Sequence, residues 1–315
     1  MTETADFITA VETALKFVGF LFHRLEKEIT REEKMDKQEQ AEFLIEAMPY
    51  IKKYFNKILV VKYGGNAMID ENLKSSVMRD LVVLNLLGIK VVLVHGGGPE
   101  ISDTIKKMGM ETRFVDGLRY TDEATSEVVR MVLAGKVNKS LTDLICKHGG
   151  KAIGVCGQDN HMLKCEMQDE KLGYVGKITE INTQLITDML GLGYVPVIST
   201  VGYDDEGNVY NVNADTAAAA LAGALNAESL ILMTDIRGLL ENKDDPESLI
   251  HKVYVSDIPA LIKQGIISGG MIPKIECCKD AIRRGVKKAV IIDGRVSHSI
   301  LIELLSDEGS GTMFL

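Results

Sequence analysis

The sequence predicts an α/β protein built on a mainly parallel sheet, and two observations carry that prediction. Apolar, β-branched runs at 58–61 and 89–94 each end in a glycine turn, and a stretch with helical periodicity follows each turn. Strand, glycine turn and helix, repeated in this order, are typical of βαβ units. The chain has 315 residues and is 46% hydrophobic, which is enough for one large domain or two lobes.

Composition restricts the kinds of binding partner and the cellular compartment that we expect for the protein. The formal net charge of −9 argues against nucleic acid as a partner. The five cysteines lack CxxC spacing, so reduced thiols in a cytoplasmic protein are expected. The apolar stretch 7–22 is short for a membrane span and is interrupted by Glu12 and Lys16, with no basic region before it. We therefore expect neither a membrane anchor nor a targeting signal.

An N-terminal helical extension is predicted over residues 1–55. Apolar residues recur with a period near 3.6 between 6 and 29. Such a stripe fits a helix packed on the protein's own body or an oligomerisation helix, and less well a helix on a membrane surface. A helical pattern resumes at 41–54 with Pro49 inside it, so a bend near 46–49 is expected.

The remaining elements alternate along the chain. The periodicity and turn residues predict helices at 72–87, 121–134, 136–148, 184–190, 213–225, 257–264, 272–284 and 297–305. They predict further strands at 151–155, 162–166, 194–199, 229–233 and 288–292, with 162–166 suited to a hairpin. The polar turn 204–208 separates two predicted lobes, 56–207 and 208–315.

Two glycine turns predict an anion site. Gly64–Gly65 and Gly96–Gly98 both end apolar strands and both precede helices. Ligands of open α/β sheets bind beyond the carboxyl ends of the strands, where bare glycine N–H groups can approach phosphate oxygens. The pair of turns, with Lys62 in the first, can hold a phosphoryl group. The chain has no GxxxxGK[ST] motif and no GxGxxG after its first strand, which argues against Walker A and dinucleotide sites.

Three further clusters carry charged residues at helix starts. Lys274 follows Gly269–Gly270 into a helix, where the helix dipole disfavours a cation unless an anion is bound. Asp215 either stabilises its own helix, which Asn213 would cap, or orients the two lysines. Arg119 is either an exposed residue or a bidentate fork for a carboxylate.

These clusters occur in order as VKYGGNAM (61–68), VHGGGP (94–99), GLRYTD (117–122), NVNADTAA (211–218), LMTDIRGLL (232–240), GGMIPK (269–274) and DEGSGTM (307–313). From about Glu46 to its C-terminus the chain thus resembles the amino acid kinase family, within it the branch that phosphorylates N-acetyl-L-glutamate. The resemblance implies a three-layer αβα sandwich with a mainly parallel central sheet and an N-terminal helical extension. It assigns the acceptor and the dimer contact to lobe 56–207, and ATP, bound with Mg²⁺, to lobe 208–315.

Motif position also implies a role for each site residue. The catalytic group would be Lys62, Lys274 and Asp215. The substrate would bind Gly64, Gly65, Gly97, Gly98, Arg119 and Asn211. The nucleotide would bind Thr234, Asp235, Gly269, Gly270 and Met271. The acceptor is a carboxylate with a pKa near ~4.3, already ionised at neutral pH, so the transfer needs no general base.

The resemblance extends to regulation. Arginine-inhibited members of the family carry an N-terminal helix that links dimers into a hexameric ring. Tyr50, Glu303 and Gly309 match their arginine site, while Val290 takes the place of a histidine. We therefore expect a homo-oligomer, a dimer at least and a hexamer inhibited by L-arginine. The alternatives are a kinase for a related carboxylate, such as a carrier-linked aminoadipate, and a non-catalytic arginine- or nucleotide-sensing module.

Overall fold

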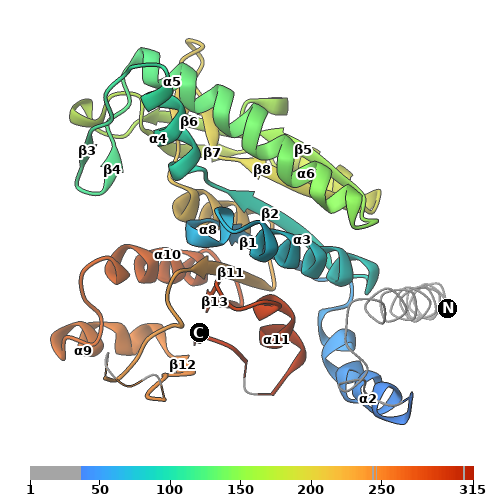
Figure 1. The fold of residues 1–315 in the computed structure, drawn as a ribbon. Coiled ribbons are helices and arrows are strands. Elements are labelled where there is room, and N and C mark those ends of the chain that lie inside the picture. The colour runs from blue at the N-terminus through green and yellow to red at the C-terminus, as the bar shows by residue number, and fades with distance from the viewer. Residues whose placement is uncertain (1–36, 243–244, 246, 308) are drawn as a thin grey trace.

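The computed structural model describes residues 37–315 except 243–244, 246 and 308, so the helix expected at 6–29 lies outside the described residues. Its centre is an eight-stranded sheet in the order β12-β14-β13-β11-β1-β2-β8-β5 (Figure 1). Every pairing in it is parallel except β13 with β14, which confirms the mainly parallel sheet. The strands are β1 (Ile58–Tyr63), β2 (Lys90–His95), β5 (Ala152–Cys156), β8 (Val195–Ser199), β11 (Ser229–Thr234), β12 (Lys252–Val253), β13 (Lys288–Asp293) and β14 (Thr312–Phe314).

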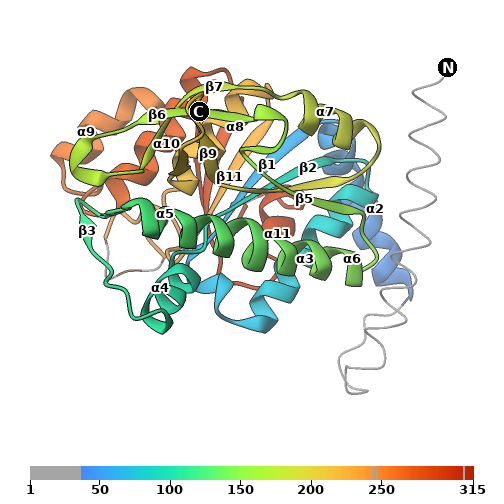
Figure 2. The ribbon, with the colours of Figure 1, turned by 90° about the horizontal axis from the view of Figure 1, so that it is seen from above.

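Helices cover both faces of this sheet, which confirms the three-layer sandwich (Figure 2). Residues of β11 and β13 are buried throughout, as expected for strands covered on both faces. One face carries α3 (Glu71–Leu86), α4 (Gly98–Lys107), α5 (Glu123–Arg130), α6 (Asn138–Lys147) and α11 (Ser299–Leu305). The other face carries α7 (Gln184–Gly191), α8 (Ala214–Ala224) and α10 (Met271–Arg283). The short helix α9 (Ile258–Lys263) precedes α10.

A second sheet holds short strands that the sequence pattern mostly did not predict. Its order is β10-β9-β6-β7, with β10 (Val209–Asn211), β9 (Val201–Tyr203), β6 (Leu163–Met167) and β7 (Gly176–Ile181). The antiparallel pairing of β6 with β7 confirms the expected hairpin. The turn 204–208 closes the hairpin of β9 and β10, and Asp204 accepts hydrogen bonds from the backbone N–H groups of Glu206 and Asn208 at 3.0 and 2.9 Å. The lobe limits at 207/208 remain a prediction.

The N-terminal helix α2 (Lys37–Tyr54) begins earlier than expected and continues through Pro49. It packs against the body through Ala47 and Ile51, which form a small cluster with Leu87. Ile45 on the same helix is 69% exposed. Within the residues described, no helix combines the length and the apolar character needed to cross a bilayer.

The two helices expected at 121–134 and 136–148 are one continuous helical segment, so the separation between them was wrong. A π-helical turn, η2 (Met131–Val137), joins α5 to α6. A π turn accommodates an extra residue without breaking the helix, and such turns are frequent at functional sites. Here the wider turn brings Leu133 and Val137 against Gly97, where an added Cβ would lie only 2.7 Å from Leu133 Cδ2.

An ion pair joins α3 to the start of α11. His298 has a left-handed backbone (φ 61°), and its Nδ1 lies 2.6 Å from Oδ1 of the fully buried Asp80. The hydrogen bond and the charge of Asp80 raise the pKa of His298 above its ordinary value. A raised pKa in the folded protein means that this pair stabilises the fold most when the imidazole is protonated.

We therefore predict that His298→Asn lowers the free energy of unfolding more at pH 6 than at pH 8.5. The contribution of the protonated imidazole is fully present below the unfolded pKa of about 6.5, and it is lost as the pH rises through the folded value. Urea denaturation of wild type and variant at both pH values measures the difference. An equal loss at the two pH values would contradict the prediction.

Candidate active site

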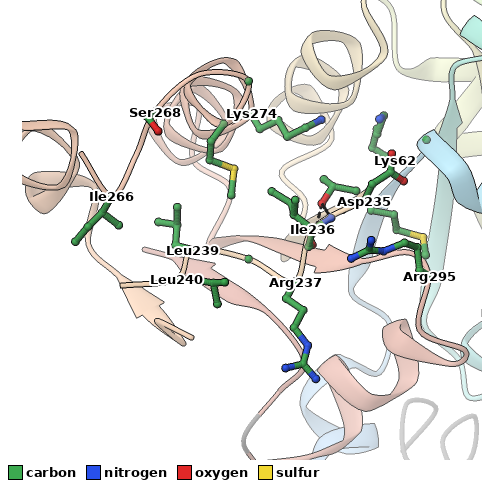
Figure 3. Close-up of a pocket in the computed structure, with 16 residues that line it drawn as sticks. Lys62, Asp235, Ile236, Arg237, Leu239, Leu240, Ile266, Ser268, Lys274 and Arg295 are labelled. Carbon is green, nitrogen blue, oxygen red and sulfur yellow. Dashed lines mark hydrogen bonds between the residues drawn. The ribbon is translucent and has the colours of Figure 1, made fainter. Parts of the chain in front are cut away.

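Two lysines and one aspartate meet near the carboxyl end of β1, where the helices α8 and α10 begin. Lys62 lies near the end of β1, Asp215 in the first turn of α8 and Lys274 in the first turn of α10. Lys62 Nζ lies 2.8 Å from Asp215 Oδ1, and Lys274 Nζ lies 3.2 Å from Asp215 Oδ2. Figure 3 shows Lys62 and Lys274 reaching into one cavity from different elements. The fold thus brings together the three residues predicted to act in catalysis.

The charge state of this group follows from its contacts. Burial alone would raise the pKa of Asp215, but Lys62 and Lys274 outweigh burial and hold that pKa below its ordinary value. The carboxylate is therefore ionised, and two ammonium groups share one negative charge. Asn213 caps α8 by accepting hydrogen bonds from the backbone N–H groups of Asp215 and Thr216 at 3.0 and 3.1 Å. The excess positive charge suits an anionic ligand.

The first glycine turn packs against the same charged side chains. A Cβ added at Gly64 would lie 2.8 Å from Lys62 Nζ. Gly65 has a left-handed backbone (φ 75°), and a Cβ there would lie 2.6 Å from Asp235 Oδ1. Any side chain at either position would displace a charged group of the site. The lack of side chains lets the backbone of this turn lie close to Lys62 and Asp235.

A cavity of about 640 Å³ opens beside this turn and the lysines. Its lining includes several predicted residues, namely Lys62, Gly65, Thr234, Asp235, Gly270, Met271 and Lys274. Gly269, predicted with them, is not among the lining residues. One wall is apolar and consists of Met233, Ile236, Leu239, Leu240, Ile266 and Met271. The cavity therefore combines an apolar wall with a cationic end.

Sequence reasoning missed two arginines of this cavity. Arg237 lies inside the quoted segment 232–240, but no role was inferred for it. Arg295 follows β13, and its Nε and Nη2 donate to the two carboxylate oxygens of Asp293 at 2.9 and 2.8 Å. Lys62 was predicted from its place where an apolar strand meets a glycine turn, and Arg295 stands beside Gly294 at the end of β13, so the same signal could have identified it.

The second glycine turn belongs to a separate polar network. Arg119 is only 7% exposed, which excludes the interpretation that it is an exposed residue. Its Nη2 donates to the carbonyl oxygen of Gly98 at 3.0 Å and to Ser102 Oγ at 2.8 Å. Thr121 Oγ1 donates to the carbonyl oxygen of Arg119 at 2.9 Å and accepts from Asn211 Nδ2 at 3.3 Å.

This network adjoins the charged group. A Cβ added at Gly96 would lie 3.4 Å from Cβ of Ala214, the residue before Asp215. None of the predicted acceptor residues Gly97, Gly98, Arg119 and Asn211 lines the large cavity, so the network and the cavity are distinct regions that both adjoin the charged group. A group transferred between two ligands would pass the lysines.

The three residues matched to an arginine site meet where α2 contacts α11. Tyr50 donates a hydrogen bond to Asp307. The buried Glu303 accepts from the backbone N–H of Ser310 at 2.9 Å, and a Cβ added at Gly309 would lie 2.7 Å from Glu303 Oε2. Lys288 Nζ lies 3.9 Å from Glu303 Oε1, an ion pair that is too long for a hydrogen bond.

Comparison with known proteins identifies one family, in both the family match and the similar sequences. A sequence model of the amino acid kinase family matches residues 57–293. The chain is 52% identical over 278 residues to acetylglutamate kinase of Clostridium beijerinckii, which covers 87% of this chain and 98% of that protein. It is 54% identical over 276 residues to acetylglutamate kinase of Clostridioides difficile, which covers 87% of this chain and 96% of that protein.

Solved structures show the same fold. The protein smu.665 from Streptococcus mutans is 29% identical and superposes with a TM-score of 0.67, covering 82% of this chain and 98% of that one. Carbamate kinase from Giardia lamblia bound to AMP-PNP covers the same shares with a TM-score of 0.58. Its identity is 17%, so it supports the fold alone.

Proposed function

The chain belongs to the amino acid kinase family, and from that premise we propose that it phosphorylates N-acetyl-L-glutamate with ATP. The product is N-acetyl-L-glutamyl 5-phosphate, an intermediate of arginine biosynthesis. Relatives that share more than half of their residues with this chain bear the name acetylglutamate kinase. The observation that carries the proposal is the group of Lys62, Asp215 and Lys274 between a large cavity and a second polar network.

The chemistry follows from this arrangement. A side-chain carboxylate oxygen of the acceptor forms a bond to the γ-phosphorus of ATP, and the bond from that phosphorus to the β–γ bridging oxygen breaks to leave ADP. Repulsion between the anions is the obstacle, and phosphoryl transfer is catalysed mainly by positioning and electrostatic stabilisation. Lys62 and Lys274 supply positive charge to the phosphoryl oxygens, and Asp215 holds the two ammonium groups in place. Backbone N–H groups of Gly64, Gly65 and Gly97 donate to the same oxygens.

ATP fits the large cavity. Its volume of about 640 Å³ lies within the usual range for small-molecule sites. The apolar wall suits the adenine base, and Gly270 and Lys274, which also line the cavity, would contact the phosphates. Mg²⁺ commonly binds through substrate phosphates and water with one or two carboxylates, and Asp235 is the carboxylate that faces this cavity. When bound, Mg²⁺ neutralises phosphate charge. No group of three or more His, Cys, Asp or Glu residues suited to a metal occurs in the part of the chain described.

The acceptor fits the second network. The guanidinium of Arg119 is held through Nη2 by the carbonyl oxygen of Gly98 and by Ser102, and it offers its positive charge and its remaining N–H groups to a carboxylate. The side chain of Asn211 lies beside it through Thr121. Arg119 and Asn211 would thereby bind the acceptor's second carboxylate and direct its side chain toward Lys62.

An acyl-phosphate assay tests the proposed function. Hydroxylamine traps the product as a hydroxamate, and N-acetyl-L-glutamate is compared with glutamate, aspartate and aminoadipate. We expect N-acetyl-L-glutamate to give by far the highest kcat/KM. Absence of hydroxamate with this acceptor would refute the proposal. Product with aminoadipate alone would instead indicate a kinase for a related carboxylate, and no product at all would favour a sensing module.

The same assay applied to an Arg119→Lys variant tests the acceptor site. Lysine keeps the charge but loses the planar guanidinium and its bonds to Gly98 and Ser102, so we expect the KM for N-acetyl-L-glutamate to rise about 10- to 100-fold. The KM for ATP should stay within a factor of about three, because Arg119 lies outside the large cavity. A rise in the KM for ATP alone would place Arg119 in the nucleotide site instead.

We also propose that the enzyme is a cytoplasmic homo-oligomer, a hexamer built from dimers, that L-arginine inhibits. The exposed Ile45 on α2 offers an apolar contact, and Glu303 offers a buried carboxylate to a guanidinium. In the cytoplasm its free cysteines stay reduced. We predict that millimolar arginine inhibits the wild type and that Glu303→Gln abolishes the inhibition while leaving kcat without arginine unchanged. A dimer by light scattering with activity insensitive to arginine would contradict this.

A further inference from the structure

We propose that His95, together with Asn138, is a positioning residue that fixes the Gly96–Gly97 peptide so that the Gly97 N–H points to the phosphoryl group. The inference deepens the proposed function and rests on it. His95 is the last residue of β2 and is completely buried beneath the second glycine turn. Its ring touches neither ligand site directly, so it acts through the backbone.

The hydrogen bonds of His95 define a single tautomer. The side-chain nitrogen of Asn138, Nδ2, lies 2.8 Å from the carbonyl oxygen of Val197 and 3.2 Å from that of Val155. Carbonyl oxygens only accept, so this atom is the amide nitrogen and must donate. The same nitrogen lies 3.1 Å from His95 Nε2, closer than to the carbonyl oxygen of Val155, so we assign its two hydrogens to Val197 and His95, and Nε2 accepts. The ring proton then sits on Nδ1 and is donated to the carbonyl oxygen of Gly96 at 2.8 Å.

Burial keeps the ring in this state. It lowers the pKa of His95 to about 4, so the imidazole is neutral throughout the neutral pH range. A neutral imidazole has one donor and one acceptor, and here both are used. His95 therefore neither carries a proton during the reaction nor adds charge to the site. Its remaining effect is geometric.

The geometry of a peptide unit carries this effect to the reacting group. A trans peptide is planar, and its C=O and N–H point in opposite directions. When His95 holds the carbonyl of Gly96 toward the interior, the N–H of Gly97 is turned away from the imidazole. Leu133 and Val137 pack against the Cα of Gly97, and Arg119 holds the carbonyl of Gly98. Each of the three glycines of this turn is therefore held by a contact with the side chain of another residue.

Such a constraint matters because glycine has little conformational preference of its own. A donor that is already aimed at developing charge needs no reorganisation during the reaction, and one such donor is worth about 10²- to 10³-fold in kcat. If the Gly96–Gly97 peptide could rotate, part of that stabilisation would be lost. His95 and Asn138 supply the order that the glycine turn lacks.

Two substitutions at one position separate the two hydrogen bonds of the ring. In His95→Asn the amide nitrogen can take the place of Nδ1 and still donate to Gly96. In His95→Gln the longer amide can take the place of Nε2 and keep the bond to Asn138, but the donation to Gly96 is lost. In the hydroxamate assay we expect His95→Gln to lower kcat by about 10- to 100-fold with the KM for ATP within about threefold. His95→Asn should retain kcat within about fivefold, since the aimed N–H is kept.

Thermal unfolding of both variants provides the control for folding. We expect similar unfolding midpoints for the two variants, since each loses the same buried ring. The difference in kcat between them then measures the effect of the orientation of the Gly96–Gly97 peptide. Equal losses of kcat in both variants, or losses that follow the unfolding midpoints, would overturn the inference while the wild type still makes hydroxamate. If the wild type makes no hydroxamate, the proposed function fails and the inference fails with it.

Discussion

Lys274→Met is expected to lower kcat by about 10²- to 10³-fold while the KM for N-acetyl-L-glutamate changes by less than about threefold. The ammonium group lies 3.2 Å from Asp215 Oδ2 at the edge of the large cavity. Methionine keeps most of the aliphatic stem and removes only the charge. An interaction stronger in the transition state than in the ground state affects kcat rather than KM, and charge on the transferred phosphoryl group is such an interaction.

A second lysine of the same helix gives a matched control. Lys279 on α10 pairs with Glu276 outside the cavity, so Lys279→Met removes the same charge from the same helix without touching the site. We expect wild-type kcat from this control. Wild-type kcat in Lys274→Met, or a change confined to the KM for ATP, would show that Lys274 only binds the nucleotide.

The stability of the Lys274→Met protein should stay close to that of the wild type. The Lys274 side chain is 28% exposed, and Asp215 keeps Lys62 as a partner after the substitution. Partly exposed ion pairs contribute about 0–1 kcal/mol. The loss of activity can therefore be measured on a folded enzyme.

The sequence was sufficient for the features that depend on local pattern. Buried β-branched runs, glycine turns and helix caps predicted β1, β2, the first turn of α8 and the parallel sheet. The same rules placed Lys62, Asp215 and Lys274 at the carboxyl end of a strand or at helix starts. Their meeting around one carboxylate follows because those ends lie on one edge of the sheet.

Other features depend on packing and left no local signal. Strands of two or three residues, such as β4 (Leu118–Arg119) and β14, are too short for periodicity to distinguish them from loops. The π turn η2 exists where the helix meets Gly97, a contact between segments far apart in the sequence. The burial of Arg119 likewise comes from Gly98 and Ser102 and could not be seen in its own segment.

Asp215→Ala should have an even larger effect because it removes activity and stability together. Without the carboxylate, Lys62 and Lys274 face each other with no anion between them, and the Lys62 side chain is only 10% exposed. Breaking a buried pair by removing one partner typically costs about 3–5 kcal/mol, because the remaining charge is left uncompensated. We expect a loss of roughly 3 kcal/mol in unfolding free energy and a fall in kcat of at least about 10³-fold, since neither lysine is held in position.

The nucleotide should reverse part of the loss in stability but none of the loss in kcat. ATP brings its own negative charge to the two lysines, so the rise in unfolding midpoint on adding ATP should be greater for Asp215→Ala than for the wild type. Asp280→Ala is the control, because Asp280 pairs with Arg284 on the exposed side of α10. An Asp215→Ala protein as stable as the wild type would mean that the lysines are held by other contacts. A variant with wild-type kcat would mean that the carboxylate only stabilises the start of its own helix, the alternative that the sequence alone left open.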